Sequence, residues 1–383
     1  MRVLLPFVRS EAANTENEDG VLATWQQGVP EFKDAAAVAP RHPSSHIGVV
    51  LAWQNFWDEN PPLADEFLRE LIASRPVQRL RRIGFLGAID YLVHGNGAAR
   101  HRRRHNRFDH SVGVALLALR YALHRNLSDE ETRLLTAAAL LHDIGHGPLS
   151  HTLEPTFKKL FHIDHHAAGR QILNGTSPLG CDIPAIFAKY HVELDRVIGL
   201  LTGADPGPHA FLFDSPMNVD TIEAIARCCL LSRNPDLVTP TAFVDAIATR
   251  ADFPTDLGDR FWAVKGVIYK TVILSSSGLL ADSLAQEYMA QRAAEFHADD
   301  FFLDDTVLRR KHPALFNLFT RIRTRSLPDA SLLTLNFDLE IEATARDFTV
   351  NKHVPIHSPH DLAVRYTQQK NKRKMRLKSL LNL

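Results

Sequence analysis

The feature that most constrains this 383-residue chain is an apolar helix that runs directly into the polar pair His142-Asp143. Ser128 and Glu131 form an S-x-x-E capping box, which predicts where the helix begins. Residues 134–141 are apolar nearly all round, so the helix should lie at the centre of the fold. A polar pair at the end of a buried helix is costly unless something satisfies it. We therefore expect a ligand at this helix end, and a metal ion would serve both side chains.

Helical periodicity dominates the rest of the chain. It begins near Leu63, is interrupted at Pro76, and recurs in residues 110–124, 165–173, 219–231, 260–296 and 305–323. The period changes to two only near the C-terminus, where apolar and polar residues alternate from Leu335 to Ala343 and predict a strand. The expected fold class is mainly α, with a helical core and a small β appendage near the C-terminus.

The composition divides the chain into three regions. Residues 1–46 are polar with scattered proline and glycine, which is typical of a flexible arm. Residues 47–325 form the helical domain, and residues 326–383 form a small α/β region with a basic tail. The tail from Gln368 is interpreted as a surface helix or a helix docked on a neighbouring subunit, with nucleic-acid binding as the alternative.

The total numbers of charged residues indicate no particular partner. Lysine plus arginine equals aspartate plus glutamate, 44 each, so any attraction of a charged ligand must be local. The three cysteines (Cys181, Cys228 and Cys229) suit a reducing compartment and no disulfide framework. No stretch approaches the roughly 20 apolar residues that span a bilayer, and the start of the chain lacks a signal-peptide core. We expect a soluble, cytoplasmic protein with no membrane contact.

Four residues form the candidate metal site: His110, His142, Asp143 and Asp220. Each lies at or near the end of a predicted apolar helix, so helices packed side by side can bring them together. Two imidazoles and two carboxylates suit Mn, Fe, Zn, Co or Ni, with Mg less comfortable against histidine nitrogen. The pattern leaves open whether one or two ions bind.

Further histidines surround this set, because several of the chain's 20 cluster between positions 101 and 166. His146, His151, His165 and His166 are candidates for holding phosphate oxygens and for protonating a leaving group. Arg107 could add a bidentate phosphate clamp. The basic run from Arg100 to Arg107 could attract an anionic substrate to the site, or contact nucleic acid.

Four strings carry a resemblance to a known family: QRLRRI (78–83), NRFDHSVGV (106–114), LLHDIGHGPLSH (140–151) and NVD (218–220). In order and spacing they resemble the HD-domain metal-dependent phosphohydrolase superfamily, and most closely its deoxynucleoside-triphosphate triphosphohydrolase branch. The resemblance covers about residues 67–288. It implies an HD-type helical phosphohydrolase domain.

The resemblance also implies residue roles. His110, His142, Asp143 and Asp220 would be the metal ligands, and Arg107, His146 and His151 would contact the phosphates. The family's further histidine falls on His165 or His166, and His165 fits better because Gly169 and Ile172 then take the family's small and apolar positions. In this branch, metal-activated water attacks the α-phosphorus and releases nucleoside and triphosphate. The catalytic set would therefore be Asp143, His146, His151 and His165, with His166 among the phosphate contacts.

The chain departs from the family where the substrate binds. Thr221 and Ala224 stand where the branch has a lysine and a tyrosine, and Phe85 stands where it has a nucleotide-contacting glutamine. These departures keep open a phosphomonoesterase or phosphodiesterase acting on another phosphorylated substrate or on nucleic acid. Oxygen chemistry at a di-iron centre and a nucleotide-sensing regulatory protein rank lower.

The resemblance implies assembly as well. Relatives in this branch are commonly homo-oligomers, and some need a nucleotide bound at an interface. Gln78 and Arg81 match part of that regulatory pattern, whereas Ala73 stands near the place of its acidic residue. We expect a homo-oligomer acting on a nucleotide, and we expect allosteric activation only weakly.

Overall fold

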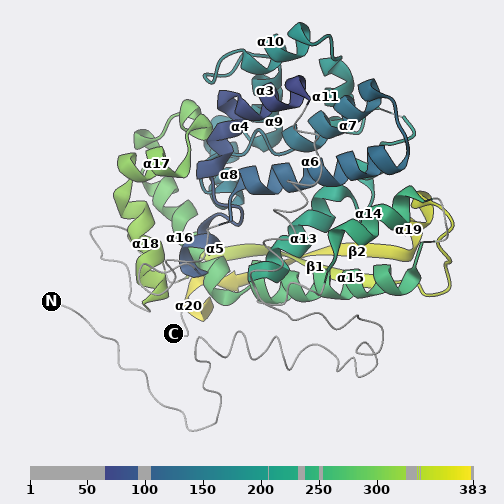
Figure 1. Cartoon of the computed structure of the whole chain (residues 1–383). Coiled ribbons are helices and arrows are strands. Elements are labelled where there is room, and N and C mark those ends of the chain that lie inside the picture. The colour runs from purple at the N-terminus through teal and green to yellow at the C-terminus, as the bar shows by residue number, and fades with distance from the viewer. Residues whose placement is uncertain are drawn as a thin grey trace, which may run out of the picture.

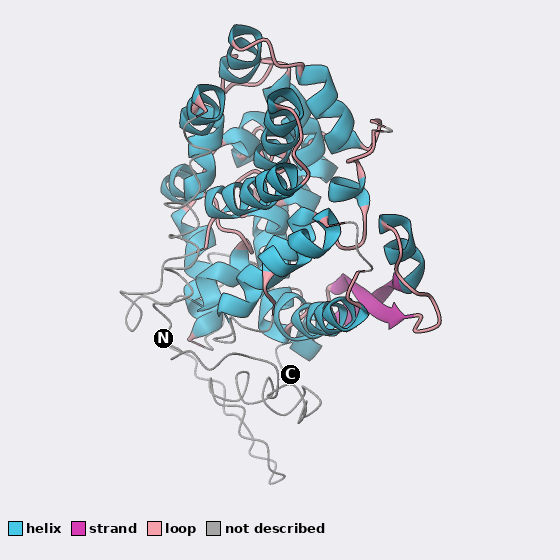
Figure 2. Cartoon of the chain, turned by 45° about the vertical axis from the view of Figure 1, so that its right-hand side comes forward, coloured by secondary structure: helices cyan, strands magenta, loops and turns pink. Residues whose placement is uncertain are grey.

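The computed structural model describes residues 65–93, 105–205, 207–231, 238–249, 253–324, 334, 336 and 338–380. All of the predicted N-terminal arm (1–46) and residues 100–104 of the basic run before Arg107 therefore lie outside the described residues. The described part is mainly helical, and its one sheet is a two-stranded antiparallel hairpin near the C-terminus (Figure 2). The predicted fold class is confirmed.

Figure 1 shows the order of the elements along the chain. The first part contains α3 (Glu66–Ala73), α4 (Arg75–Arg79), η3 (Leu80–Arg82), α5 (Ala88–Val93), α6 (Arg107–His124), α7 (Asp129–Leu141), η4 (Ser150–Thr152), α8 (Glu154–Phe161), α9 (His165–Leu173), α10 (Asp182–Lys189), α11 (Leu194–Thr202) and α12 (Phe211–Asp214). The second part contains α13 (Val219–Leu231), α14 (Pro240–Ala248), α15 (Thr255–Ile268), the π-helical turn η6 (Tyr269–Ile273), α16 (Ser276–Gln291), η7 (Ala293–Glu295), η8 (Ala298–Phe302), α17 (Asp305–Lys311), α18 (Pro313–Arg323), β1 (Glu340–Val350), α19 (Pro359–Arg365), β2 (Tyr366–Arg376) and α20 (Leu377–Leu380).

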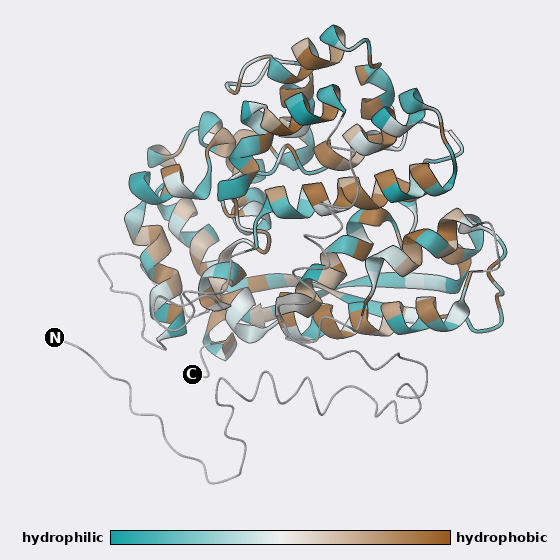
Figure 3. Cartoon of the chain, in the orientation of Figure 1, coloured by the Kyte–Doolittle hydropathy of each residue, from teal (hydrophilic) through white to brown (hydrophobic). Residues whose placement is uncertain are grey.

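Helices α6 and α7 pack against each other at the centre of the molecule. The predicted cap of α7 is present, because Ser128 Oγ accepts from the backbone N–H of Glu131 at 3.2 Å and donates to its carboxylate at 3.1 Å. Residues 134–141 are all buried, as the apolar run predicts. Figure 3 shows apolar stretches along α6, in contrast to the mostly hydrophilic strand pair. The buried central helix ends at His142-Asp143, so the polar pair does lie inside the fold.

The C-terminal hairpin differs from both sequence interpretations. Of the strand predicted from Leu335 to Ala343, residues 335 and 337 lie outside the described residues. The strand is absent at Asp338 and Leu339, since β1 begins at Glu340 and continues to Val350. The predicted helix from Gln368 is also wrong, because β2 pairs with β1 along its whole length. All but two of the β2 residues are exposed, so the strand has no buried face to produce alternating hydrophobicity. Nucleic-acid binding by the basic residues of β2 stays a prediction.

Within the described ranges, no single helix has both the length and the hydropathy needed to cross a membrane. The bent pair of residues 255–273 and 276–291 meets these criteria only when its two halves are taken together.

A carboxylate on α16 holds the segment that follows the polar motif. Thr152 Oγ1 donates to Asp282 at 2.6 Å and accepts from the backbone N–H of Ala88 at 2.9 Å. The side-chain amide of Gln286 donates to the Thr152 carbonyl at 2.9 Å. Burial raises the pKa of Asp282 to about 6, against the opposing effect of the Thr152 hydrogen bond. The η4 segment is thus attached to a carboxylate that pays a desolvation cost when ionised.

We predict that Asp282→Asn stabilises the protein at high pH. A folded-state pKa of about 6 exceeds the unfolded value of about 3.9, so the protonated carboxyl favours folding below pH 4 and this contribution disappears as the pH rises through 6. The free energy of unfolding of the variant should exceed that of the wild type by about 3 kcal/mol at pH 8 and match it near pH 4. Urea unfolding across this range measures it. Exposed Asp299→Asn is the control, and parallel wild-type and D282N curves would contradict the prediction.

Candidate metal centre

Three helices supply the four predicted ligands. His110 lies one turn into α6, His142 and Asp143 follow the end of α7, and Asp220 lies in the first turn of α13. Both α7 and α13 pack against α6. This packing brings side chains as distant in the sequence as His110 and Asp220 into one cluster. The structure therefore brings together His110, His142, Asp143 and Asp220, as the sequence predicts.

The ligand atoms converge on one point. His110 Nε2 lies 3.1 Å from His142 Nε2, 3.4 Å from Asp143 Oδ2 and 3.0 Å from Asp220 Oδ1. His142 Nε2 lies 3.4 Å from Asp143 Oδ2 and 3.6 Å from Asp220 Oδ1. Donor atoms that each stand about 2.1 Å from one ion are separated by about 3.0–3.4 Å. The observed separations suit a shared metal ion.

The second nitrogen of each imidazole tests this fit. His110 Nδ1 lies 2.5 Å from the Glu223 carboxylate, and His142 Nδ1 lies 2.8 Å from the Ala139 carbonyl. Both neighbours accept hydrogen bonds, so they place the proton on Nδ1 and leave the Nε2 lone pair facing the cluster. Two lone pairs 3.1 Å apart repel each other unless a cation lies between them. The residues present therefore fit a divalent metal.

The charges around the cluster also favour a bound metal ion. Burial alone would lower the pKa of His110, yet Glu223, Asp220 and Asp143 together raise it. For His142, too, Asp143 and Asp220 outweigh burial and raise the pKa well above its usual value. The pKa of Asp220 is lowered, because hydrogen bonds from the two imidazoles outweigh the partial desolvation of its carboxylate. The field that favours protons on these imidazoles equally favours a metal cation.

Arg107 occupies a different place from the predicted phosphate clamp. Its Nη1 donates to Asp143 Oδ2 at 2.5 Å, while Nε and Nη2 donate to Ser150 Oγ at 3.0 and 2.6 Å. Ser150 in turn lies 3.3 Å from His146 Nδ1, and His146 Nε2 lies 3.2 Å from Asp143 Oδ1. These contacts form a closed ring that holds both oxygens of Asp143. Burial, and then Arg107, lower the pKa of His146 well below its usual value, so His146 stays neutral.

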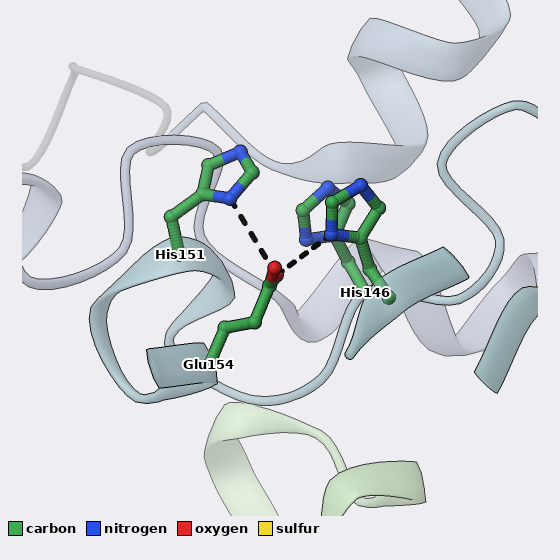
Figure 4. Close-up of side chains that lie close together, drawn as sticks. His146, His151 and Glu154 are labelled. Carbon is green, nitrogen blue, oxygen red and sulfur yellow. Dashed lines mark hydrogen bonds and ion pairs between the residues drawn. The ribbon is translucent and has the colours of Figure 1, made fainter. Parts of the chain in front are cut away.

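A second cluster, the histidine–glutamate cluster, consists of His146, His151, Glu154 and His165. Glu154 Oε2 lies 2.8 Å from His165 Nδ1 and 3.6 Å from His151 Nδ1, and Figure 4 shows the carboxylate reaching between the imidazoles. The His146 and His165 rings stack at 4.5 Å. Although burial opposes it, hydrogen bonds from the two histidines lower the pKa of Glu154, which is therefore ionised.

The structure separates the two adjacent histidines. His165 belongs to the histidine–glutamate cluster, whereas His166 is exposed and its ring lies 4.0 Å from that of His165. Gly145 allows this placement, because a Cβ there would stand 1.9 Å from the backbone oxygen of His165. The geometry therefore favours His165 as the functional histidine and leaves His166 at the edge of the site.

Sequence reasoning missed two carboxylates. Glu154 follows His151 by three residues and Glu223 follows Asp220 by three, so each shares a helical face with a predicted site residue. Gly113, one turn after His110, also pointed to Glu223: a Cβ at position 113 would stand 2.4 Å from a Glu223 carboxylate oxygen. Glycine here makes room for the carboxylate that orients the ligand imidazole.

We predict that Glu223→Gln lowers the metal affinity of the site by about 10- to 100-fold. A glutamine amide can donate to His110 Nδ1, which would move the imidazole proton to Nε2 and block ligation. Titration of the metal-free protein with Mn²⁺, followed by electron paramagnetic resonance, gives the dissociation constant. Exposed Glu66→Gln serves as the control. Equal affinities of E223Q and wild type would contradict this role for Glu223.

Comparisons with known proteins agree with this geometry. Residues 107–178 match the family model of the HD domain. The chain is 40% identical over 139 residues to the uncharacterized protein YwfO of Bacillus subtilis, a match covering 35% of this chain and 30% of YwfO. It is 29% identical over 252 residues to the deoxynucleoside triphosphate triphosphohydrolase SAMHD1 homolog of Dictyostelium discoideum, covering 62% of this chain and 46% of that protein. The chain thus spans less than half the length of either relative.

A solved structure extends the similarity of the fold. A hypothetical protein from Aquifex aeolicus superposes with a TM-score of 0.59 at 16% identity, covering 83% of this chain and 94% of that one. The family match begins at Arg107 and includes the predicted ligands His110, His142 and Asp143, which the structure groups as a candidate metal site. Residues 107–178 therefore match an HD domain, and histidines and aspartates of this chain are arranged to hold a divalent metal ion.

Proposed function

We propose that the chain is a nucleotide phosphohydrolase that cleaves (deoxy)nucleoside triphosphates into nucleoside and triphosphate. The observation that carries the proposal is the position of the histidine–glutamate cluster directly beside the metal centre, with His146 joined to the ligand Asp143. A bound divalent metal supplies a water of lowered pKa and neutralises charge that develops on phosphorus. The similarity to a deoxynucleoside triphosphate triphosphohydrolase homolog supports this choice of substrate.

The residues of the chain divide the remaining work. Neutral His146 donates to Asp143 through Nε2, which keeps one carboxylate oxygen directed at the cluster of ligands. Glu154 lies beside Nδ1 of both His151 and His165, so it orients the Nε2 atoms of these imidazoles away from itself. An imidazole held in this way can donate a proton to a leaving alkoxide. His151, whose side chain is mostly exposed, is the group we assign to that donation.

Product analysis by chromatography tests the proposal. Full-length protein loaded in turn with Mn, Fe, Co, Ni, Zn or Mg would meet ribo- and deoxynucleotides, singly and in mixtures. We expect nucleoside and triphosphate, and no product from the His142→Ala/Asp143→Ala variant. Inorganic phosphate would instead identify a phosphatase, and intact nucleotide in every mixture would refute the proposed function.

We further predict that His151→Asn lowers kcat by about 10²- to 10⁴-fold while metal content stays unchanged. The loss should appear in kcat more than in KM, because the proton donation occurs in the transition state. Steady-state assays with metal analysis of the same samples measure both. Exposed His162→Asn, in the same segment, is the matched control. A loss of metal with activity would assign His151 to ligand binding instead.

A further inference from the structure

The metal centre is open to solvent on two sides. The Asp220 side chain is 48% exposed and that of His151 is 64% exposed, whereas the His110 side chain is 1% exposed. A substrate that spans the centre therefore extends past Asp220 at one end and past His151 at the other. At the His151 end, the histidine–glutamate cluster can contact the substrate. At the Asp220 end, no residue has yet been assigned to contact it.

An unusual buried cation lies at the Asp220 end. Lys265 of α15 is 4% exposed, and its ammonium donates to the carbonyl of Pro216, four residues before Asp220, at 3.3 Å. The same ammonium stands 4.5 Å from the centre of the Trp262 ring. A buried lysine is rare unless a carboxylate pairs with it. In the described ranges, no carboxylate lies within ion-pair distance of Lys265.

Of the other three buried lysine and arginine side chains in the described ranges, two form ion pairs with carboxylates. Arg107 contacts Asp143, and Arg365 contacts Asp259 with two nitrogens. Arg79 donates to the carbonyls of Leu303 and Ile144, and its charge interacts with nearby carboxylates on α17 and at its N-terminus. Burial, and then Arg346, lower the pKa of Lys265 to about 8, against the opposing effect of Asp220.

The hairpin adds further positive charge to the same place. β1 packs against α15, and Phe348 of β1 contacts both Trp262 and Tyr269. Arg346, two residues before Phe348 on the same strand face, stacks its guanidinium on the Tyr269 ring at 4.7 Å. Directly opposite Arg346 in β2 is Lys370. Like charges in opposite positions of a strand pair are destabilising.

The rest of the hairpin pairs its lysines with acids. Lys372 contacts Glu342 at 2.8 Å and Lys374 contacts Glu340 at 2.6 Å. Arg346 and Lys370 have no such carboxylate among the described residues. The charges of Arg346 and Asp220 both act on Lys265, and Lys370 lies opposite Arg346 in β2. Asp220 is also a predicted metal ligand, and none of the three cations makes an ion pair with a carboxylate among the described residues.

The chemistry of the site indicates which anion. Arg107 donates to Asp143 and Ser150, and Thr221, which follows Asp220, carries no charge. We propose that Lys265, Arg346 and Lys370 form an anion subsite beside Asp220 that binds the polyphosphate group of a nucleotide. The assignment to a nucleotide rests on the proposed function. It places the polyphosphate at the Asp220 end and the nucleoside at the His151 end.

Tripolyphosphate binding tests the subsite without requiring turnover. Sodium tripolyphosphate would be titrated by calorimetry into the full-length chain, once loaded with Mn²⁺ and once stripped of metal so that chelation cannot contribute. Lys265→Met and Arg346→Gln should each raise the dissociation constant by about tenfold or more in both series, which corresponds to about 1.4 kcal/mol. Lys270→Met is the matched control, because Lys270 is exposed and follows Tyr269 in the chain.

The outcomes separate the subsite from the proposed function. Weaker tripolyphosphate binding in K265M and R346Q, but not in K270M, supports the subsite even if no nucleotide is hydrolysed. Unchanged binding in both variants overturns the subsite even if hydrolysis is observed. Thermal unfolding tests whether K265M is folded. The variant should unfold at the wild-type temperature or above, because it replaces a buried charge that has no ion-pair partner by an apolar side chain. R346Q, on the partly exposed hairpin, gives the same test should K265M fail to fold.

Discussion

The site depends on keeping the Asp143 carboxylate buried, ionised and fixed. Transferring a carboxylate from water into a protein interior costs several kcal/mol unless charged and hydrogen-bonding partners compensate. Arg107 and His146 provide them, one for each oxygen, and Ser150 joins these two partners to each other. Because burial alone would raise the pKa of Asp143, the lowered value reflects these partners, with His142. The same ring connects the first turn of α6, the end of α7 and the loop that follows.

That loop is held by residues far away in the sequence. Leu149 and Ser150 both adopt left-handed backbone conformations, which cost about 1–2 kcal/mol each for residues with a side chain. The Leu149 N–H donates to Asp305 Oδ1 at 2.7 Å, and Arg79 donates to the Ile144 carbonyl at 2.9 Å. Asp305 also accepts from the backbone N–H of Gly84 at 3.1 Å. The strained loop therefore keeps its shape because residues before and after the HD domain hydrogen-bond to its backbone.

The sequence predicted the site better than the periphery, for a physical reason. Helix ends fix where His110, His142, Asp143 and Asp220 point, so periodicity and spacing were enough to group them. The hydrogen-bond partners were harder to predict. Arg107 lies three residues before His110 whether it faces a phosphate or Asp143, and only packing decides between these. The β2 strand was missed because its residues are exposed, and Ala343 and Ala345 of β1 are buried but give a weak apolar signal.

In the hairpin, the sequence alone does not distinguish basic residues at a solvated surface from basic residues that bind a ligand. A strand with basic residues at every second position reads as a solvated surface, and its carboxylate pairs at Lys372 and Lys374 agree with that reading. The pairing register changes the interpretation for Arg346 and Lys370, because it sets two cations opposite each other. Such a pair opposes the formation of the hairpin, and α15 adds a third cation nearby instead of relieving it. A fold tolerates concentrated charge of one sign most readily where a ligand of the opposite sign completes it, and here that place borders the metal centre.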